Sequence, residues 1–356
     1  MKINRATSQR MFILLLAAVL LLAAAGCGKE EQTNGNAAGS TVQDGDVTLV
    51  IGAYSVVKDA FADVLPAFQD YWLQETGQKV TFQESYEASG TQARAIAGGF
   101  EADVAILAME GDLDKIADAG FIMHDWKAQS NGGNITNSIV VLGTRAGNPL
   151  GIKDWEDLTR KGVKVLYPNP KTSGGAQWDI NAIYGAGLKQ SEEKSGTKDE
   201  AYAKSFLKAV HANVESLDKS GRASMAAFEY GVGDVIVTYE NELLARIKKG
   251  VDYDIVVPKS TILIENPAAI VDKNADKHGS RKVAEAFIAF LHSDEAQRLF
   301  VEHGFRAVDE KVAVDTKERY TVPDELFDIS YLGGWPEVRK NLYSKKGIWY
   351  QVLADL

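Results

Sequence analysis

Short apolar runs alternate with longer amphipathic stretches along most of this chain. Runs of about four to eight apolar residues are typical of buried strands, whereas apolar residues spaced three and four apart are typical of helices that pack on one face. Strand-like runs occur at 47–53, 80–84, 102–107, 135–143, 163–167, 234–239, 255–258 and 268–271, and helical stretches at 61–76, 91–98, 113–119, 180–188, 206–210, 225–228, 281–291 and 294–303. The alternation predicts βαβ units, and therefore an α/β protein with mainly parallel sheets flanked by helices.

The part of the chain from Val47 onward is long enough for two cores. Chains beyond about 250–300 residues usually divide into more than one compact unit. We expect one lobe from 47–136 together with 263–356, and a second from 137–262, with 135–143 as the first crossing between them. Because ligands of α/β sheets bind outside the carboxyl ends of the strands, two facing lobes would enclose a ligand cleft.

Residues 1–26 have the pattern of a secretory signal. Lys2, Arg5 and Arg10 form a positive start, and an almost unbroken apolar run follows at 11–25. This run is shorter than the ~20 residues that a membrane-spanning helix needs, and it ends in small residues. We therefore expect 1–26 to be a signal peptide that the folded protein does not contain.

The end of this segment, 22–27, resembles a lipobox, the motif whose cysteine is acylated and becomes the mature N-terminus. Cys27 is the only cysteine, so it has no partner for an internal disulfide. The segment 27–46 is rich in Gly, Asn, Gln, Ser and Thr, and it contains too few apolar residues to form a core. We expect Cys27 to carry a lipid, an incidental thiol being the alternative, and 27–46 to be a flexible tether.

The charge balance limits the choice of partners. The formal net charge of −10 becomes −13 without the three cations of 1–26, because that segment contains no acid. Such an acidic body argues against nucleic acid and against anionic lipid surfaces as partners. It also means that an anion would have to bind through local dipoles, against the overall field.

The stretch 169–178, Asn-Pro-Lys-Thr-Ser-Gly-Gly-Ala-Gln-Trp, combines the features of an anion site. It follows the strand-like run 163–167 and delivers small residues to the start of a helix. The first N–H groups of a helix have no internal partner and carry about half a positive charge. Gly174 and Gly175 let a ligand approach the backbone, and Ser173 adds a hydroxyl. The alternative is a Ser cap followed by a plain turn.

These ten residues resemble the N-P-K-[ST]-S-G-G-A-R-W signature of the sulfate- and thiosulfate-binding proteins of bacterial ABC importers. Only Gln177 departs from it, where the family has Arg. The resemblance covers nearly the whole chain from residue 47 and ends at 326–335, which is similar to the family's F-x-I…F-G-G-W. It implies a two-lobed periplasmic-binding-protein-like (type II) fold, with the terminal segment packed on the first lobe and Trp335 in a packing role.

Two segments of the predicted first lobe resemble ligand loops of this family. The segment around Ser89 matches S-G-x-Q, and 101–104 matches the nearby E-A-D-V. The resemblance implies that Ser89 donates its hydroxyl to sulfate. Tyr54 and Ser55 lie where the family reads S-Y-D-P, so the backbone N–H of Ser55 would take the place of that of the Asp. A helix cap at Ser89 and a plain strand end at Ser55 are the alternatives.

Two segments of the predicted second lobe complete the site that the resemblance implies. The loop 217–224 resembles D-S-G-A-R-G-S, which places a ligand-binding N–H at Gly221. Residues 239–242 resemble W-E-N-E, with Tyr239 in place of the Trp whose indole N–H binds the ligand. A phenol also donates, but it accepts as well and has a different reach, so this replacement bears on anion selectivity. A core tyrosine without a ligand role is the alternative.

The chemistry of sulfate agrees with this choice of residues. Sulfate has two charges and no proton at neutral pH, so its ideal site offers donors only, whereas a phosphate site can use a carboxylate to read the remaining proton. Helix N-termini can spread the charge without a Lys or Arg. Thiosulfate, molybdate, tungstate and phosphate stay open as ligands. The predicted donors are the hydroxyls of Ser89 and Tyr239 and the N–H groups of Ser55, Ser173, Gly174, Gly175 and Gly221.

A secreted serine hydrolase is the competing class. Ser89 or Ser173 could be its nucleophile, but the chain contains no Gly-x-Ser-x-Gly elbow. The five histidines stand alone, without the paired spacing of a zinc site or a base dyad. We therefore expect no enzyme activity, no cofactor and no metal.

The resemblance implies a monomeric receptor that is lipid-anchored on the outer face of the cytoplasmic membrane. Sulfate would bind between the lobes and favour the closed state, for which it has the higher affinity. The closed form would dock on a membrane permease whose ATPase subunits drive import.

Overall fold

A computed structural model describes residues 45–356, which belong to one compact unit. The predicted signal peptide, the predicted lipid site at Cys27 and most of the predicted tether lie outside the described residues, so they stay predictions. Within residues 45–356, no helix combines the length and the apolar character needed to cross a lipid bilayer.

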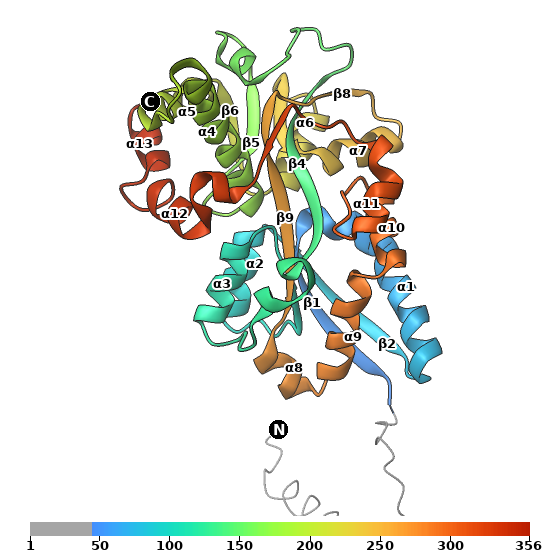
Figure 1. The fold of residues 1–356 in the computed structure, drawn as a ribbon. Coiled ribbons are helices and arrows are strands. Elements are labelled where there is room, and N and C mark those ends of the chain that lie inside the picture. The colour runs from blue at the N-terminus through green and yellow to red at the C-terminus, as the bar shows by residue number, and fades with distance from the viewer. Residues whose placement is uncertain (1–44) are drawn as a thin grey trace, which may run out of the picture. The chain divides into compact units, whose positions relative to one another are not determined.

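The strands of residues 45–356 form one mixed sheet in the order β2-β1-β3-β9-β4-β7-β5-β6, with β8 paired to β4 and β10 to β9 (Figure 1). Two groups are parallel, β2-β1-β3 and β7-β5-β6. The long strands β4 and β9 join these groups and pair antiparallel with each other. The strands are β1 Val47–Tyr54, β2 Val80–Glu87, β3 Val104–Ile106, β4 Asn134–Arg145, β5 Val165–Pro168, β6 Val214–Asp218, β7 Val235–Tyr239, β8 Tyr253–Val256, β9 Ser260–Ile270 and β10 Glu325–Phe327.

Helices cover both faces of the two strand groups (Figure 1). The α-helices are α1 Lys58–Thr76, α2 Ser89–Ala97, α3 Glu110–Asp118, α4 Gly174–Ser195, α5 Glu200–His211, α6 Gly221–Glu229, α7 Glu240–Lys248, α8 Asp272–His278, α9 Arg281–Leu291, α10 Asp294–Glu302, α11 Glu310–Thr316, α12 Gly334–Asn341 and α13 Ile348–Ala354. The 3-10 helices are η1 Ser55–Val57, η2 Trp126–Ala128, η3 Ser130–Gly133, η4 Trp155–Thr159, η5 Lys317–Arg319 and η6 Ile329–Leu332.

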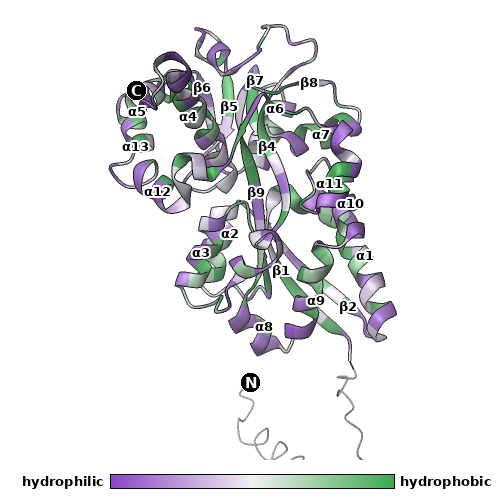
Figure 2. Cartoon of the chain, in the orientation of Figure 1, coloured by the Kyte–Doolittle hydropathy of each residue, from purple (hydrophilic) through white to green (hydrophobic). Residues whose placement is uncertain are grey.

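The hydrophobic pattern explains these layers. Strands β3 and β7 are buried at every position, as a strand requires when helices cover both of its faces. In α9 the apolar residues recur on one face, and Phe287 packs against Phe68 of α1 with ring centres 5.0 Å apart. Figure 2 shows the hydrophobic strands inside and the hydrophilic positions mainly on the outer sides of the helices.

The predicted α/β architecture is confirmed, and the largest differences from the expected elements lie at α4 and β9. The helix expected at 180–188 is the middle of α4, and the strand expected at 268–271 is the end of β9. In β9 polar residues interrupt the apolar run, but they are buried and bonded: Thr261 Oγ1 donates to Val140 O at 2.6 Å, and Asn266 Nδ2 donates to Ala108 O at 3.0 Å. The hydrophobic pattern alone therefore misses most of this strand.

The C-terminal helices pack mainly on α4 and α5, which differs from the expected position on the first lobe (Figure 1). A contact with the predicted first lobe is also present, because Arg339 of α12 pairs with Asp114 of α3 at 3.1 Å. Trp349 of α13 meets His211 of α5 edge-on, with ring centres 4.8 Å apart. Trp335 of α12 meets Trp178 of α4 at 4.9 Å, which confirms its packing role. Aromatic surface on α4 and α5 thus decides where the segment lies.

We expect Gly185→Ala to destabilise the protein. Gly185 lies on the face of α4 beneath β10, where a Cβ would overlap the ring of Phe327. An exposed helical Gly→Ala change gains about 1 kcal/mol, whereas overpacking costs roughly 1–3 kcal/mol. Urea unfolding measures the sign.

The double variant Gly185→Ala with Phe327→Leu is the control, because a smaller, flexible side chain makes room for the methyl group. Its loss of stability should be smaller than the sum of the losses measured for Gly185→Ala and Phe327→Leu separately. A stabilising effect of Gly185→Ala in the wild-type background would contradict this packing.

Candidate ligand-binding site

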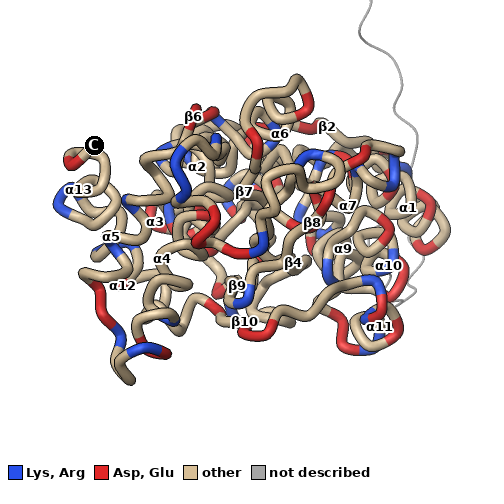
Figure 3. Tube along the Cα trace, turned by 90° about the horizontal axis from the view of Figure 1, so that it is seen from above, with Lys and Arg blue, Asp and Glu red and all other residues tan. Residues whose placement is uncertain are grey.

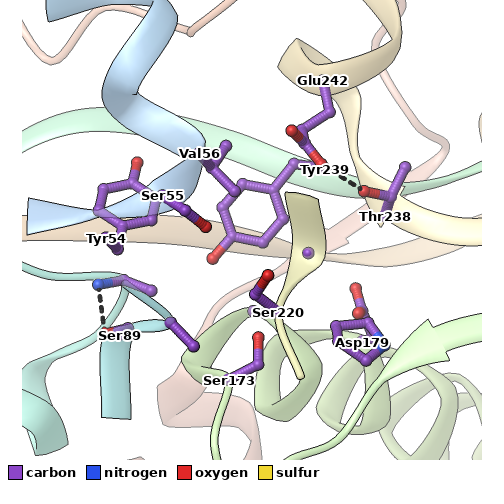
Figure 4. A pocket seen from close by; sticks show the side chains of 15 residues that line it. Tyr54, Ser55, Val56, Ser89, Ser173, Asp179, Ser220, Thr238, Tyr239 and Glu242 are labelled. Atoms are coloured by element: carbon purple, nitrogen blue, oxygen red, sulfur yellow. Dashed lines mark hydrogen bonds between the residues drawn. The ribbon is translucent and has the colours of Figure 1, made fainter. Parts of the chain in front are cut away.

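Six stretches that are separate in the sequence meet at one small pocket (Figure 4). Its volume is about 20 Å³, which is little more than the space for one water. The pocket therefore suits a compact ion and not a sugar or an amino acid. Its lining consists of Tyr54, Ser55, Val56, Ala88, Ser89, Ala108, Pro168, Ser173, Gly175, Asp179, Ser220, Gly221, Thr238, Tyr239 and Glu242.

Four of the segments are helix N-termini that follow strand ends. Ser55 begins η1, Ser89 begins α2, Gly174 begins α4 and Gly221 begins α6. The N–H groups of a first helical turn have no acceptor in their own helix and carry partial positive charge. The structure brings six of the predicted residues into the lining, namely Ser55, Ser89, Ser173, Gly175, Gly221 and Tyr239.

The start of α4 contributes a hydroxyl and an open stretch of backbone. Ser173 caps the helix, because its Oγ accepts from the N–H of Ala176 at 3.3 Å. Its own N–H donates to Asn169 O at 2.9 Å, so the hydroxyl is what Ser173 can offer a ligand, and not the predicted N–H. At Gly175 a Cβ would lie 3.4 Å from the ring of Tyr239, so the glycine keeps this space open. Gly174 lies beside the lining, against Ala108.

Ser89 lines the pocket, but its hydroxyl is already hydrogen-bonded within the protein. Its hydroxyl donates to Asp112 Oδ2 at 2.6 Å and accepts from the N–H of Ala108 at 2.9 Å. Asp112 is paired with Lys115 at 2.6 Å. The expected hydroxyl donor is therefore already bonded inside the protein, and the N–H of Ser89 at the start of α2 is the group left for a ligand.

Arg222 links the start of α6 to the end of β1. Its Nε donates to Ser55 O at 3.1 Å, and its guanidinium pairs with Asp59 at 3.0 Å. This contact fixes the start of α6 next to the start of η1, so that Ser55 and Gly221 line the pocket together. The loop 217–224 thus contributes a positioning residue as well as a backbone donor.

Two tyrosine hydroxyls reach the pocket region without a hydrogen-bond partner among residues 45–356, those of Tyr54 and Tyr239. A buried polar group without a partner costs about 1–3 kcal/mol. Burial raises the pKa of both hydroxyls far above the ordinary value, so they remain neutral donors. Tyr239 ends β7 and precedes α7, and Figure 4 shows it in the pocket with Ser173 and Ser220.

Two carboxyl groups also line the pocket, which is a departure from the donor-only site that we expected. Asp179 is 1% exposed, and its Oδ1 has no partner among the described residues. Burial raises its pKa well above the ordinary value, and the neighbouring Glu242 adds to the shift. Glu242 is buried as well, which raises its pKa, but it has Arg246 at 3.5 Å.

Both acids left a signal in the sequence. Asp179 directly follows the signature at Trp178 and is the one charged residue between Ser173 and Leu188, and Glu242 ends the motif 239–242. A buried acid beside a predicted anion site was therefore detectable, although its protonation was not.

Arg222 and Arg246 contact residues of the pocket wall, but they do not line the pocket themselves. Of the described residues that line it, none is Lys, Arg or His, and Figure 3 shows the basic and acidic positions interspersed along the chain. Ser89 and Ser173 thus have no imidazole in the lining to act as a base. Within residues 45–356, no cluster of His, Cys, Asp and Glu could hold a metal ion.

Comparison with known proteins places the chain in a family. A family profile described as bacterial extracellular solute-binding protein matches residues 49–306. The chain belongs to the bacterial extracellular solute-binding proteins. This solute-binding protein is 40% identical to the sulfate-binding protein of Synechococcus elongatus, over 91% of its own length and 90% of the relative. It is 34% identical to the thiosulfate-binding protein of Pseudomonas aeruginosa, over 85% and 91% of the two chains.

A solved structure supports the same assignment. The sulfate-binding protein SubI from Mycobacterium tuberculosis superimposes with a TM-score of 0.76 at 34% identity, covering 84% of this chain and all of that one. The predicted periplasmic-binding-protein fold is confirmed. Because the family consists of binding proteins and not of enzymes, the serine hydrolase alternative is set aside.

Replacing Asp179 by Asn should stabilise this solute-binding protein increasingly as the pH rises. A buried carboxyl with a raised pKa favours the fold most below the unfolded value of 3.8, and this contribution is lost as the pH rises toward the folded value. At a pH above the folded pKa, each unit of the pKa shift lowers the free energy of unfolding of the wild type by about 1.4 kcal/mol. Urea unfolding of both proteins at pH 4, 6 and 8 measures the difference.

Asp118→Asn, at an exposed position of α3, is the matched control and should show no gain with pH. If the stability of both variants, relative to the wild type, changes with pH in the same way, then ionising Asp179 costs the folded protein nothing. The burial argument is then wrong.

Proposed function

We propose that this protein is an extracytoplasmic receptor that captures sulfate in the pocket and delivers it to an ABC importer. One observation carries the proposal: four helix N-termini and neutral hydroxyls converge on a cavity of about 20 Å³ whose described lining contains no cation. Such a site holds a compact anion by dipoles and hydrogen bonds. The names of the relatives, sulfate-binding and thiosulfate-binding proteins, support a sulfur oxyanion.

The proposed donors come from both sides of the pocket. They are the N–H groups of Ser55, Ser89, Gly174, Gly175 and Gly221 and the hydroxyls of Ser173 and Tyr239. The hydroxyl of Tyr239 gains most from a ligand, because it is buried and without a partner among residues 45–356. Sulfate would replace that missing partner and offset its desolvation cost.

Sulfate then acts as a bridge between two lobes. We retain the division into 47–136 with 263–356 and 137–262, with α12 and α13 assigned to the second lobe because they pack there. Ser55 and Ser89 belong to one lobe, and Ser173, Gly221 and Tyr239 to the other. A ligand that bonds to both has its highest affinity for the closed arrangement and shifts the population toward it. The closed form docks on the permease and its ATPase subunits.

The N-terminal segment supplies the attachment. In this proposal, removal of 1–26 leaves Cys27 as a lipidated N-terminus, and 27–46 tethers a monomeric receptor to the outer face of the cytoplasmic membrane. The support is the sequence pattern described above, a positive start, an apolar run and a lone cysteine.

Calorimetric titration with sulfate tests the function directly. The purified protein is first freed of bound anions by unfolding and refolding, and sulfate is followed by thiosulfate, molybdate, tungstate and phosphate in one buffer. We expect saturable binding of sulfate with a stoichiometry of one. Folded protein that binds none of these anions would rule the site out, and binding of a different one alone would change the ligand.

Ser173→Ala should weaken sulfate binding by roughly 10- to 150-fold, because a hydrogen bond to a charged ligand is worth about 1.5–3 kcal/mol. The variant also loses a helix cap, which Ser293→Ala reproduces elsewhere: Ser293 caps α10 by accepting from Ala296 N–H at 3.1 Å. The control should lose stability and keep its sulfate affinity. Equal affinities in both variants would remove the Ser173 hydroxyl from the site.

Tyr239→Phe should weaken sulfate binding about tenfold or more and leave stability unchanged or higher, since it removes a buried hydroxyl without a partner in residues 45–356. Tyr343→Phe is the contrast, because that hydroxyl donates to Asn181 Oδ1 at 2.8 Å outside the pocket lining. It should cost stability and spare affinity. Unchanged affinity and anion ranking in Tyr239→Phe would make Tyr239 a core residue.

A further inference from the structure

We propose that Asp179 binds sulfate as a neutral carboxylic acid, so that this protein takes up one proton together with each sulfate ion when the surrounding pH is high. The inference rests on the proposed sulfate function and adds to it a ligand group and a regulation by pH. It follows from where the carboxyl lies, what surrounds it and what charge a dianion tolerates.

The position of Asp179 makes it part of the pocket wall. It lies in α4 four residues after Gly175, and residues at this spacing share one face of a helix. Helical side chains lean toward the N-terminus of their helix, so the carboxyl leans toward the open space that Gly175 leaves. The side chain is 1% exposed and lines the pocket, and its Oδ1 has no partner among residues 45–356.

No described cation faces this carboxyl from the elements packed around it. The titratable groups near enough to interact with it are Tyr239 of β7, Glu242 of α7, Tyr167 of β5 and Tyr343 between α12 and α13. Of these, Glu242 is the one whose negative charge raises the pKa of Asp179. The three tyrosines are buried and stay neutral. Behind Tyr167, whose hydroxyl lies 2.5 Å from His211 Nδ1, burial lowers the pKa of that imidazole to about 4, so it is neutral too.

Of the two acids in the lining, Asp179 is the one that holds the proton. Glu242 has the guanidinium of Arg246 at 3.5 Å, which stabilises its ionised form. Asp179 has no such partner among the described residues, and Glu242 itself disfavours a second negative charge nearby. Burial without a counter-charge is what keeps a carboxylic acid neutral.

A dianion in the pocket makes the neutral form necessary. Two carboxylates and sulfate would place four negative charges around a cavity of about 20 Å³, in surroundings that screen them poorly. Protonation removes one of these charges and turns an acceptor oxygen into an O–H donor. The donor-only rule for sulfate is then kept, with the acid as an additional donor.

The sign of the pH effect follows from linkage. Sulfate carries no proton, so a proton on Asp179 must come from solvent. Below the pKa of Asp179 in the ligand-free protein the proton is already present, and affinity is constant. Above that pKa each binding event takes up a proton, and affinity falls by up to tenfold for each pH unit.

The test is calorimetric titration of sulfate from pH 5 to pH 9, at each pH in two buffers with different ionisation heats. For the wild-type protein we expect constant affinity at low pH, a weakening that approaches tenfold for each unit at high pH, and uptake of up to one proton. Asp179→Asn should bind with no pH dependence, at least as tightly as the wild type at low pH. The two buffers report proton uptake by the wild-type protein itself. The proposal therefore remains testable even if Asp179→Asn does not fold.

Glu242→Gln is the control: it should keep the slope of the pH dependence and the proton uptake, with the weakening beginning at lower pH, because the charge of Glu242 helps to raise the pKa of Asp179. A dependence that survives in Asp179→Asn but disappears in Glu242→Gln overturns the assignment. Wild-type sulfate binding that is flat across the range, without proton uptake, overturns this proposal and leaves the proposed function intact. Binding of phosphate that Asp179→Asn abolishes would make Asp179 an ionised acceptor and overturn it as well. No sulfate binding at any pH by folded wild-type protein would refute both.

Discussion

A small anion inside a protein needs hydrogen-bond donors that bring no counter-charge with them, and in this chain the first turns of helices supply them. The sheet order makes this possible. Strands β1, β2, β5, β6 and β7 each end next to a residue of the pocket lining, and a helix begins there. Parallel strands have their carboxyl ends at one edge, so the helices that follow them begin together. The strand order therefore determines where the backbone donors of the ligand site lie, and the individual side chains add further hydrogen-bonding groups.

Much of this arrangement could be predicted from the sequence, because the informative features are local. The signature 169–178 contains its glycines, its cap and its helix start within ten residues, and the structure places Ser173 and Gly175 in the pocket as expected. Tyr239 was also found there, although its phenol replaces an indole. A binding site that is formed by the backbone of a short segment can therefore be predicted from the sequence of that segment.

The features that could not be predicted depend on distant contacts. The hydroxyl of Ser89 bonds to Asp112, which lies 23 positions away, and nothing in the segment around Ser89 indicates that partner. The place of α12 and α13 depends on aromatic surface formed by α4 and α5. The state of Asp179 depends on burial and on Glu242, which are properties of the whole fold. Periodicity and motifs do not encode such contacts.

Strands β4 and β9 have a mechanical consequence. Strand β9 pairs with β3 of one group and β4 pairs with β7 of the other. The two long strands are joined to each other by a ladder from Ile139 and Leu263 to Asn134 and Pro267, with one irregularity in register. The two sides of the pocket are thus connected by a continuous ribbon and not only by loops. If the proposed lobes move apart, the movement would twist this ribbon and would not require its ladder hydrogen bonds to break. The ion would then be exchanged by elastic deformation, and no segment would have to unfold and refold on each cycle.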